Sequence, residues 1–219
     1  MDSTTPPPDS QHARAYMQLR RLVGYVGILL PILLVAGNAL IFRGPILPSI
    51  SHYYHSGMRD VLVGGLCAMG MFLFYYSGYD RWEDLAGIAG GVFALCVAFF
   101  PTVEQGPLGI TGTIHYISAM ALFLTLATYS LFLFSRQQPD TSGRQFTTLH
   151  RICGLAMIAA VLGIVVFFLF FRSGHPDSFV PLGLETAALW AFGVSWFAEG
   201  RELTGLKPRR AAPADARRS

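Results

Sequence analysis

Long apolar runs are the feature of this sequence that most restricts its fold. A helix needs about 20 apolar residues to cross the hydrocarbon core of a bilayer. Hydrophobic residues make up 53% of the 219 residues and charged residues only 13%, well below the roughly 25% charged residues of soluble proteins. We therefore predict an all-α polytopic transmembrane helix bundle with six spans, at residues 22–42, 61–78, 85–100, 113–134, 152–171 and 179–198.

The distribution of basic residues predicts the orientation of the bundle. Lys and Arg near the ends of spans are retained on the cytoplasmic side of a membrane. Of the 16 Lys and Arg residues, only Arg43, Arg59 and Arg172 fall on the opposite side if the N-terminus is inside. An even number of spans also keeps the basic C-terminal tail inside. The sequence thus predicts that both termini are cytoplasmic.

The chain divides into a membrane domain and two tails. Residues 1–19 are rich in Pro, Ser, Thr and Gln, and we predict a disordered N-terminal tail, because such a segment has no apolar face to bury. Residues 20–202 form the six-helix domain, and residues 203–219 form a basic C-terminal tail. The net charge of +3 lies at membrane edges and in the tail, which favours membrane lipids as partners and not nucleic acid. Homo-oligomerisation stays open.

Glu185 is the most informative single residue, because an ionisable group within a span indicates a functional site. It lies in the last apolar run, where its neighbours at helical spacing are apolar. We expect its carboxylate to point into the bundle, towards Arg59, His115 or Asn38 at a similar depth. With Asp60 they are our candidate ligand-binding residues. A structural hydrogen bond or ion pair that holds helices together is the alternative.

A metal site at the same face is a second hypothesis. His52 and His55 are three residues apart, and neutral imidazole is a common ligand of zinc. Together with His115 they are the candidate zinc ligands, and a bound Zn²⁺ would activate water for hydrolysis. Ser51, Asp60 and Glu185 are then the candidate catalytic residues. Tyr53 and Tyr54 offer another interpretation of this loop, as an aromatic belt at the headgroups.

Polar residues at the cytoplasmic face have a simpler interpretation. They comprise the segment 80–84, His150 with Arg151, and the segment 199–202. We predict ordinary ion pairing at the membrane interface for these groups.

The run Pro48-Ser49-Ile50-Ser51-His52-Tyr53-Tyr54, followed by Met58-Arg59-Asp60-Val61, resembles bacterial membrane proteins of the DUF998 family, and more distantly Frag1-like six-helix proteins. The likeness also includes the 80–84 turn and the late glutamate. It implies an uncharacterised integral protein of the bacterial inner membrane.

The outer-face cluster also looks similar to that of the alkaline ceramidase and adiponectin-receptor hydrolases, which combine Ser, Asp and His around zinc. That group has seven helices and an HxxxH in the last one, whereas the last span here offers Glu185 and no histidine. Whether the protein is an enzyme therefore stays open. One hypothesis is a membrane protein that binds a lipid headgroup, small ligand or partner at its outer face. The others are a metal-dependent lipid hydrolase or transferase, and a proton-coupled transporter that uses Glu185.

Overall fold

The computed structural model describes residues 8–76, 81–103, 108–134 and 143–205. The described residues are helical apart from the connecting loops, and they contain no β-strand. The elements are α1 (Pro8–Leu40), the 3₁₀ helix η1 (Ser51–His55), α2 (Arg59–Phe74), α3 (Arg81–Phe99), α4 (Ile110–Thr128), the π-helical segment η2 (Tyr129–Leu133), α5 (Gly143–Phe170) and α6 (Val180–Gly205).

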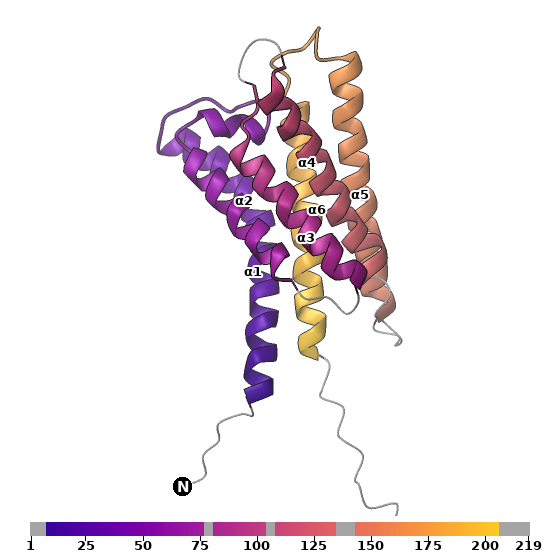
Figure 1. The fold of residues 1–219 in the computed structure, drawn as a ribbon. Coiled ribbons are helices and arrows are strands. Elements are labelled where there is room, and N and C mark those ends of the chain that lie inside the picture. Colours follow the sequence, from indigo (N-terminus) through magenta and orange to yellow (C-terminus); the bar gives the residue numbers. More distant parts are fainter. Residues whose placement is uncertain (1–7, 77–80, 104–107, 135–142, 206–219) are drawn as a thin grey trace, which may run out of the picture.

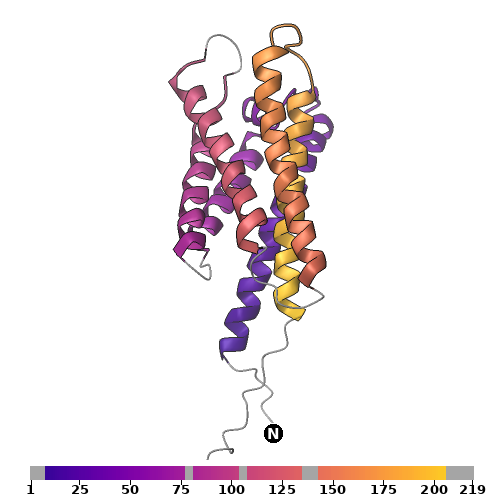
Figure 2. The same cartoon turned by 90° about the vertical axis from the view of Figure 1, so that its right-hand side faces the viewer.

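The six α-helices form a closed ring in which each helix packs on the next one along the chain and α6 returns to α1. α3 and α4 lie together, and α5 and α6 form a second close pair (Figures 1 and 2). The start of α1 and the end of α6 lie at the same end of the bundle, at the bottom of Figure 1. We call this the lower end and the opposite one, which carries η1, the upper end.

Each predicted span coincides with a helix. Among the described residues, five helical segments are long and apolar enough to cross a membrane: Gln18–Leu40, Arg81–Phe99, Ile110–Leu133, Thr147–Phe170 and Val180–Glu199. The exception is α2, whose 16 residues extend about 24 Å at the α-helical rise, short of a hydrocarbon core of roughly 30 Å. The predicted span runs to residue 78, whereas the helix ends at Phe74, and residues 77 and 78 lie outside the described part of the chain.

The prediction of a disordered tail up to residue 19 was wrong for residues 8–19, because α1 begins already at Pro8. Proline suits the first turn of a helix, and the residues after it, such as Gln11, Ala13 and Ala15, are compatible with continued helix. At the other terminus α6 continues to Gly205, past the predicted limit at 202. Residues 1–7 and 206–219, where the rest of both predicted tails falls, lie outside the described residues.

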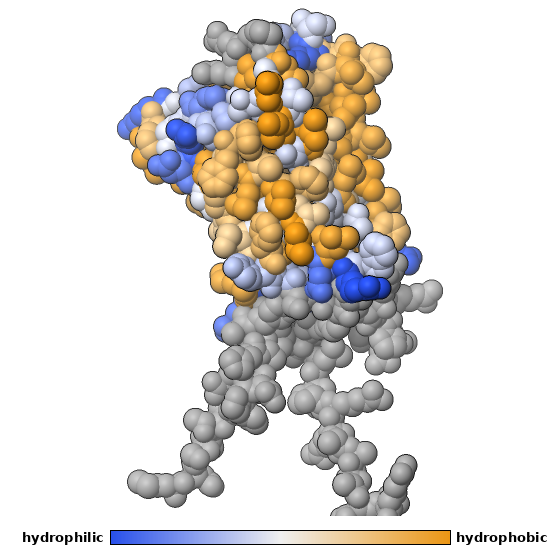
Figure 3. Space-filling model, viewed as in Figure 1, coloured by the Kyte–Doolittle hydropathy of each residue, from blue (hydrophilic) through white to orange (hydrophobic). Residues whose placement is uncertain are grey.

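The surface of the bundle is unusually apolar. Figure 3 shows apolar side chains over most of the visible flank, with polar residues at the lower end and over the loop that joins α1 to α2. Large exposed side chains include Leu33 on α1, Val92 on α3, and Leu155 and Leu162 on α5. A soluble monomer rarely exposes apolar patches of this extent. The surface therefore suits a lipid environment.

The contact between α1 and α6 is backbone to backbone. A Cβ placed on Gly193 would lie 2.7 Å from the carbonyl oxygen of Gly24, and one placed on Gly24 would lie 2.9 Å from the carbonyl oxygen of Gly193. Small residues allow helices to approach this closely in membranes. The two glycines thus fix the closure of the ring.

Aromatic side chains fill the lower half of the ring. Trp196 is buried, and its ring lies 5.0–6.0 Å from the ring centroids of five others: Phe72, Tyr76, Tyr129, Phe134 and Phe192. These residues come from α2, the η2 region and α6. Such edge-to-face packing adds to the stabilisation from burial, and it leaves the upper half of the ring as the place for a cavity.

Candidate functional site

The loop before η1 is attached to the upper end of α6 by three backbone donors. The N–H of Leu182 donates to the carbonyl oxygen of Pro48 over 2.9 Å. In return, Oε2 of Glu185 accepts the N–H groups of Ile50 at 2.5 Å and Ser51 at 3.4 Å. A carboxylate at the N-terminus of a helix satisfies N–H groups that have no helical acceptor. Glu185 therefore positions η1.

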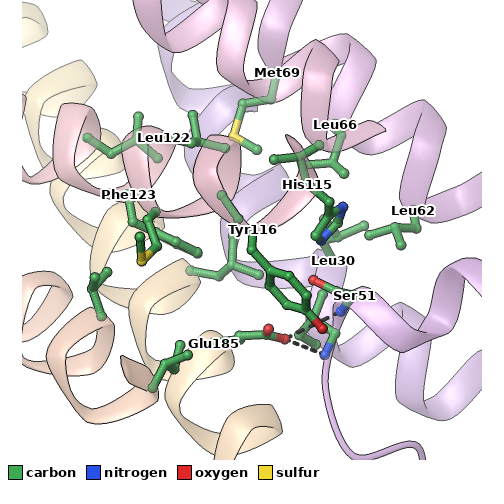
Figure 4. Close-up of a pocket in the computed structure, with 18 of the residues that line it drawn as sticks. Leu30, Ser51, Leu62, Leu66, Met69, His115, Tyr116, Leu122, Phe123 and Glu185 are labelled. Atoms are coloured by element: carbon green, nitrogen blue, oxygen red, sulfur yellow. Dashed lines mark hydrogen bonds between the residues drawn. The ribbon is translucent and has the colours of Figure 1, made fainter. Parts of the chain in front are cut away.

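Glu185 also lines a cavity in the centre of the upper half of the ring (Figure 4). The cavity volume is about 80 Å³, several times the roughly 10–15 Å³ that one water molecule needs. All six α-helices contribute to its walls, which are mostly apolar: Leu30, Leu62, Leu66, Met69, Val97, Ala119, Met120, Leu122, Phe123, Leu126, Val161, Ile164, Phe168 and Leu189. Its polar groups are Ser51, His115, Tyr116 and Glu185.

Of the four polar residues that line the cavity, His115 is the most completely buried, with 2% of its surface exposed. Its Nδ1 lies 2.7 Å from the carbonyl oxygen of Phe100. Because a carbonyl can only accept, Nδ1 carries the proton, and in the neutral ring Nε2 is an acceptor. Nε2 is buried and has no hydrogen-bond partner among the residues that the structure describes. Buried polar atoms in proteins nearly always have a hydrogen-bond partner. A ligand in the cavity could donate a hydrogen bond to Nε2.

Tyr116 reaches into the same part of the cavity. Figure 4 shows its ring directed towards Ser51 and Glu185. Its hydroxyl lies 2.9 Å from Oγ1 of Thr102, in the loop between α3 and α4. The polar end of the cavity thus combines a carboxylate, an imidazole acceptor and two hydroxyl groups.

The expected partners of Glu185 are mostly engaged elsewhere. Nδ2 of Asn38 donates to the carbonyl oxygen of Pro45, and Arg59 donates to the hydroxyl of Tyr54 and lies over its ring. Arg59 and Asn38, two of the three expected partners, therefore do not bind Glu185 in the described contacts, and backbone N–H groups occupy the carboxylate instead. Asp60 is exposed in the first turn of α2. Of these candidates only His115 shares the cavity with Glu185.

The three candidate metal ligands do not converge either. Nδ1 of His52 lies 2.6 Å from Oγ of Ser49, and Nε2 of His55 lies 2.9 Å from the carbonyl oxygen of Thr102. His115 is directed towards Phe100, as described above. Among the residues that the structure describes, no group of three or more His, Cys, Asp or Glu side chains could hold a metal ion. The described side chains therefore do not fit a zinc site.

Comparison with known proteins gives no relative. No family model, no curated protein and no solved structure matches the chain. The resemblance to the DUF998 family stays a prediction, and the geometry of the cavity is what supports a function.

A second polar cluster lies at the lower end, where Arg20 and Ser195, which the sequence analysis did not single out, join His150 and Glu199. Arg20 and Glu199 form an ion pair at 3.2 Å, and both are almost fully buried. Arg20 also donates to the hydroxyl of Tyr76. Nε2 of His150 lies 3.6 Å from Glu199, and Nδ1 of His150 lies 2.8 Å from Oγ of Ser195. The predicted ion pairing is present at Glu199, but Glu199 and His150 are buried inside the ring and do not lie at the membrane interface.

The connection Ser195–His150–Glu199 has the order of a nucleophile, base and orienting acid. Ser195 and His150 are both 0% exposed, so no substrate carbonyl can reach the serine hydroxyl. Ser195 also shares a hydrogen bond with Ser130 at 2.8 Å, and Glu199 is shared with Arg20. We therefore assign this cluster to stability, as a connection between α1, η2, α5 and α6.

Proposed function

We propose that this protein is an integral membrane protein with six spans that binds a lipid or other small amphiphile in the upper cavity. The observation that carries the proposal is a cavity with long apolar walls and a polar end, at which His115 offers a buried acceptor without a partner. Ligand sites typically combine apolar walls with a few convergent polar groups. An amphiphile likewise has an apolar chain and a polar head. Its chain would lie among the leucines and its head near Glu185.

The wall between α4 and α5 supports access from the membrane. Met120 lines the cavity and is 39% exposed, and Tyr116, Ile164 and Phe168 nearby are half-buried. α5 packs more extensively on α6 than on α4. A single chain could therefore enter sideways from the bilayer, without passing through water.

Filling the cavity tests the proposal. Ala119→Trp should weaken binding of a decyl-chain amphiphile by about tenfold or more, because the indole occupies the space of the chain. Ile117→Trp is the matched control, since it adds the same side chain at a position of α4 that is 57% exposed and does not line the cavity. Native mass spectrometry of the purified protein reports the bound fraction. Equal binding by both variants would contradict the proposal.

The proposed topology places the lower end, with both termini, in the cytoplasm, and the cavity near the outer leaflet. It is supported by the basic residues that gather at that end of the spans. Fusing a reporter that is active only outside the cytoplasm to the C-terminus should give no signal, whereas its insertion between residues 173 and 174 should give a strong one. A signal from the C-terminal fusion would contradict six spans.

Proton-coupled transport is a second candidate, because Glu185 is an ionisable group that lines a central cavity. Transport requires a route from the cavity to the lower end. The aromatic cluster around Trp196 fills the ring on that route. Binding without transport is therefore better supported. Ligand-dependent acidification of proteoliposomes would instead favour proton-coupled transport.

A further inference from the structure

The hydrogen-bonding capacity of the polar end restricts the head of the ligand. Oε2 of Glu185 receives the two backbone N–H groups, and the side chain of Ser51 also hydrogen-bonds to this carboxyl group. The Nε2 of a neutral histidine can only accept hydrogen bonds, whereas a protonated carboxyl group can also donate one. The hydroxyl of Tyr116 can either donate or accept. His115 therefore presents to the cavity one acceptor that cannot act as a donor.

The described lining of the cavity offers no cationic side chain that could pair with an anionic head. No Arg or Lys is among the residues that line the cavity in the described part of the chain. The nearest candidate in the sequence, Arg59, is exposed and interacts with Tyr54. An anionic head would meet the Glu185 carboxylate with no cation beside it, in a mostly apolar environment, and burial of an uncompensated charge is costly.

Resting on the proposed function, we infer that the cavity selects single-chain amphiphiles whose head donates hydrogen bonds, an alcohol or an amine, and excludes heads that only accept, including carboxylates. The donor would satisfy Nε2 of His115. A cavity of about 80 Å³ holds part of one chain and no second chain. The ligand class is therefore a fatty alcohol or fatty amine, or a lipid with one chain and such a head.

Four ligands with a ten-carbon chain test the inference, compared in pairs by native mass spectrometry so that their partitioning into detergent is similar. 1-Decanol and decylamine donate, whereas decyl methyl ether and decanoate, at a pH where the acid is ionised, only accept. We expect the two donors to bind about tenfold more tightly than the two acceptors, in line with the cost of an unsatisfied buried acceptor. Equal binding of 1-decanol and the ether would overturn the inference.

Two variants change the polar end with little change of shape. In Glu185→Gln the amide oxygen still accepts from Ile50 and Ser51, while the amide nitrogen puts a donor where Oε1 was. We expect this variant to reverse the order of decylamine and decanoate. In His115→Asn the amide nitrogen keeps the bond to Phe100 and the Nε2 acceptor is lost, so the preference for 1-decanol over the ether should shrink. An unchanged order in both variants would overturn the inference.

The outcomes separate the two proposals. If all four ligands bind equally and Ala119→Trp abolishes the binding of each, the cavity binds amphiphiles and only the head selectivity is wrong. If none of the four binds to the folded protein, the proposed function itself is wrong. Thermal unfolding of each variant in detergent, beside the wild type, confirms that loss of binding is not loss of fold.

Discussion

Replacing Glu199 with glutamine is expected to lower the free energy of unfolding by about 3–5 kcal/mol, the range measured when one partner of a buried ion pair is removed. The substitution keeps the size of the side chain and removes its charge. Arg20, with only 1% of its surface exposed, would then hold a buried charge without its present counter-ion. The measurement is the unfolding transition in mixed micelles with increasing SDS.

Two comparisons make that result specific. Asp177→Asn, the same chemical change at an exposed position of the loop before α6, should change the free energy of unfolding by less than about 0.5 kcal/mol. The double variant Arg20→Met with Glu199→Leu should recover much of the loss, since apolar groups of similar volume can replace a buried pair at little cost. If Glu199→Gln unfolds within about 1 kcal/mol of the wild type, the pair does not stabilise the lower end as we describe.

Substitution of Gly193 by leucine is the second change with a large expected effect. Its Cβ would lie 2.7 Å from the carbonyl oxygen of Gly24 and 3.0 Å from the backbone nitrogen of Ile28. Backbone atoms cannot move aside as a flexible side chain can, so α1 and α6 must separate. We expect a loss of about 3 kcal/mol or more in the free energy of unfolding, at the upper end of overpacking effects.

Gly183 provides the control in the same helix. A Cβ at Gly183 meets no heavy atom within 4 Å beyond its own helix, and leucine has the better helix propensity by about 0.8 kcal/mol. Gly183→Leu should therefore be neutral or slightly stabilising in the same SDS titration. A Gly193→Leu protein as stable as Gly183→Leu would show that the α1–α6 contact is looser than the structure has it.

Local sequence patterns accounted for the helices and for the direction of one side chain. Runs of apolar residues predicted the six helices because helix length and lipid contact depend on consecutive residues alone. The same reasoning predicted that Glu185 points into the bundle, since a carboxylate facing lipid is too costly. Composition was a poor guide for residues 8–19: their polar residues predicted disorder, whereas α1 begins at Pro8.

The sequence by itself thus determined a helical bundle with an apolar surface and an ionisable group within it. Only the tertiary structure decided which groups meet. Glu185 binds the backbone of Ile50, 135 positions away, and Arg20 binds Glu199, 179 positions away. A sequence shows which side chains are present but not which backbone N–H groups a loop leaves without an acceptor. The cavity has the same origin, because its volume is what remains after six helices from the whole chain have packed together.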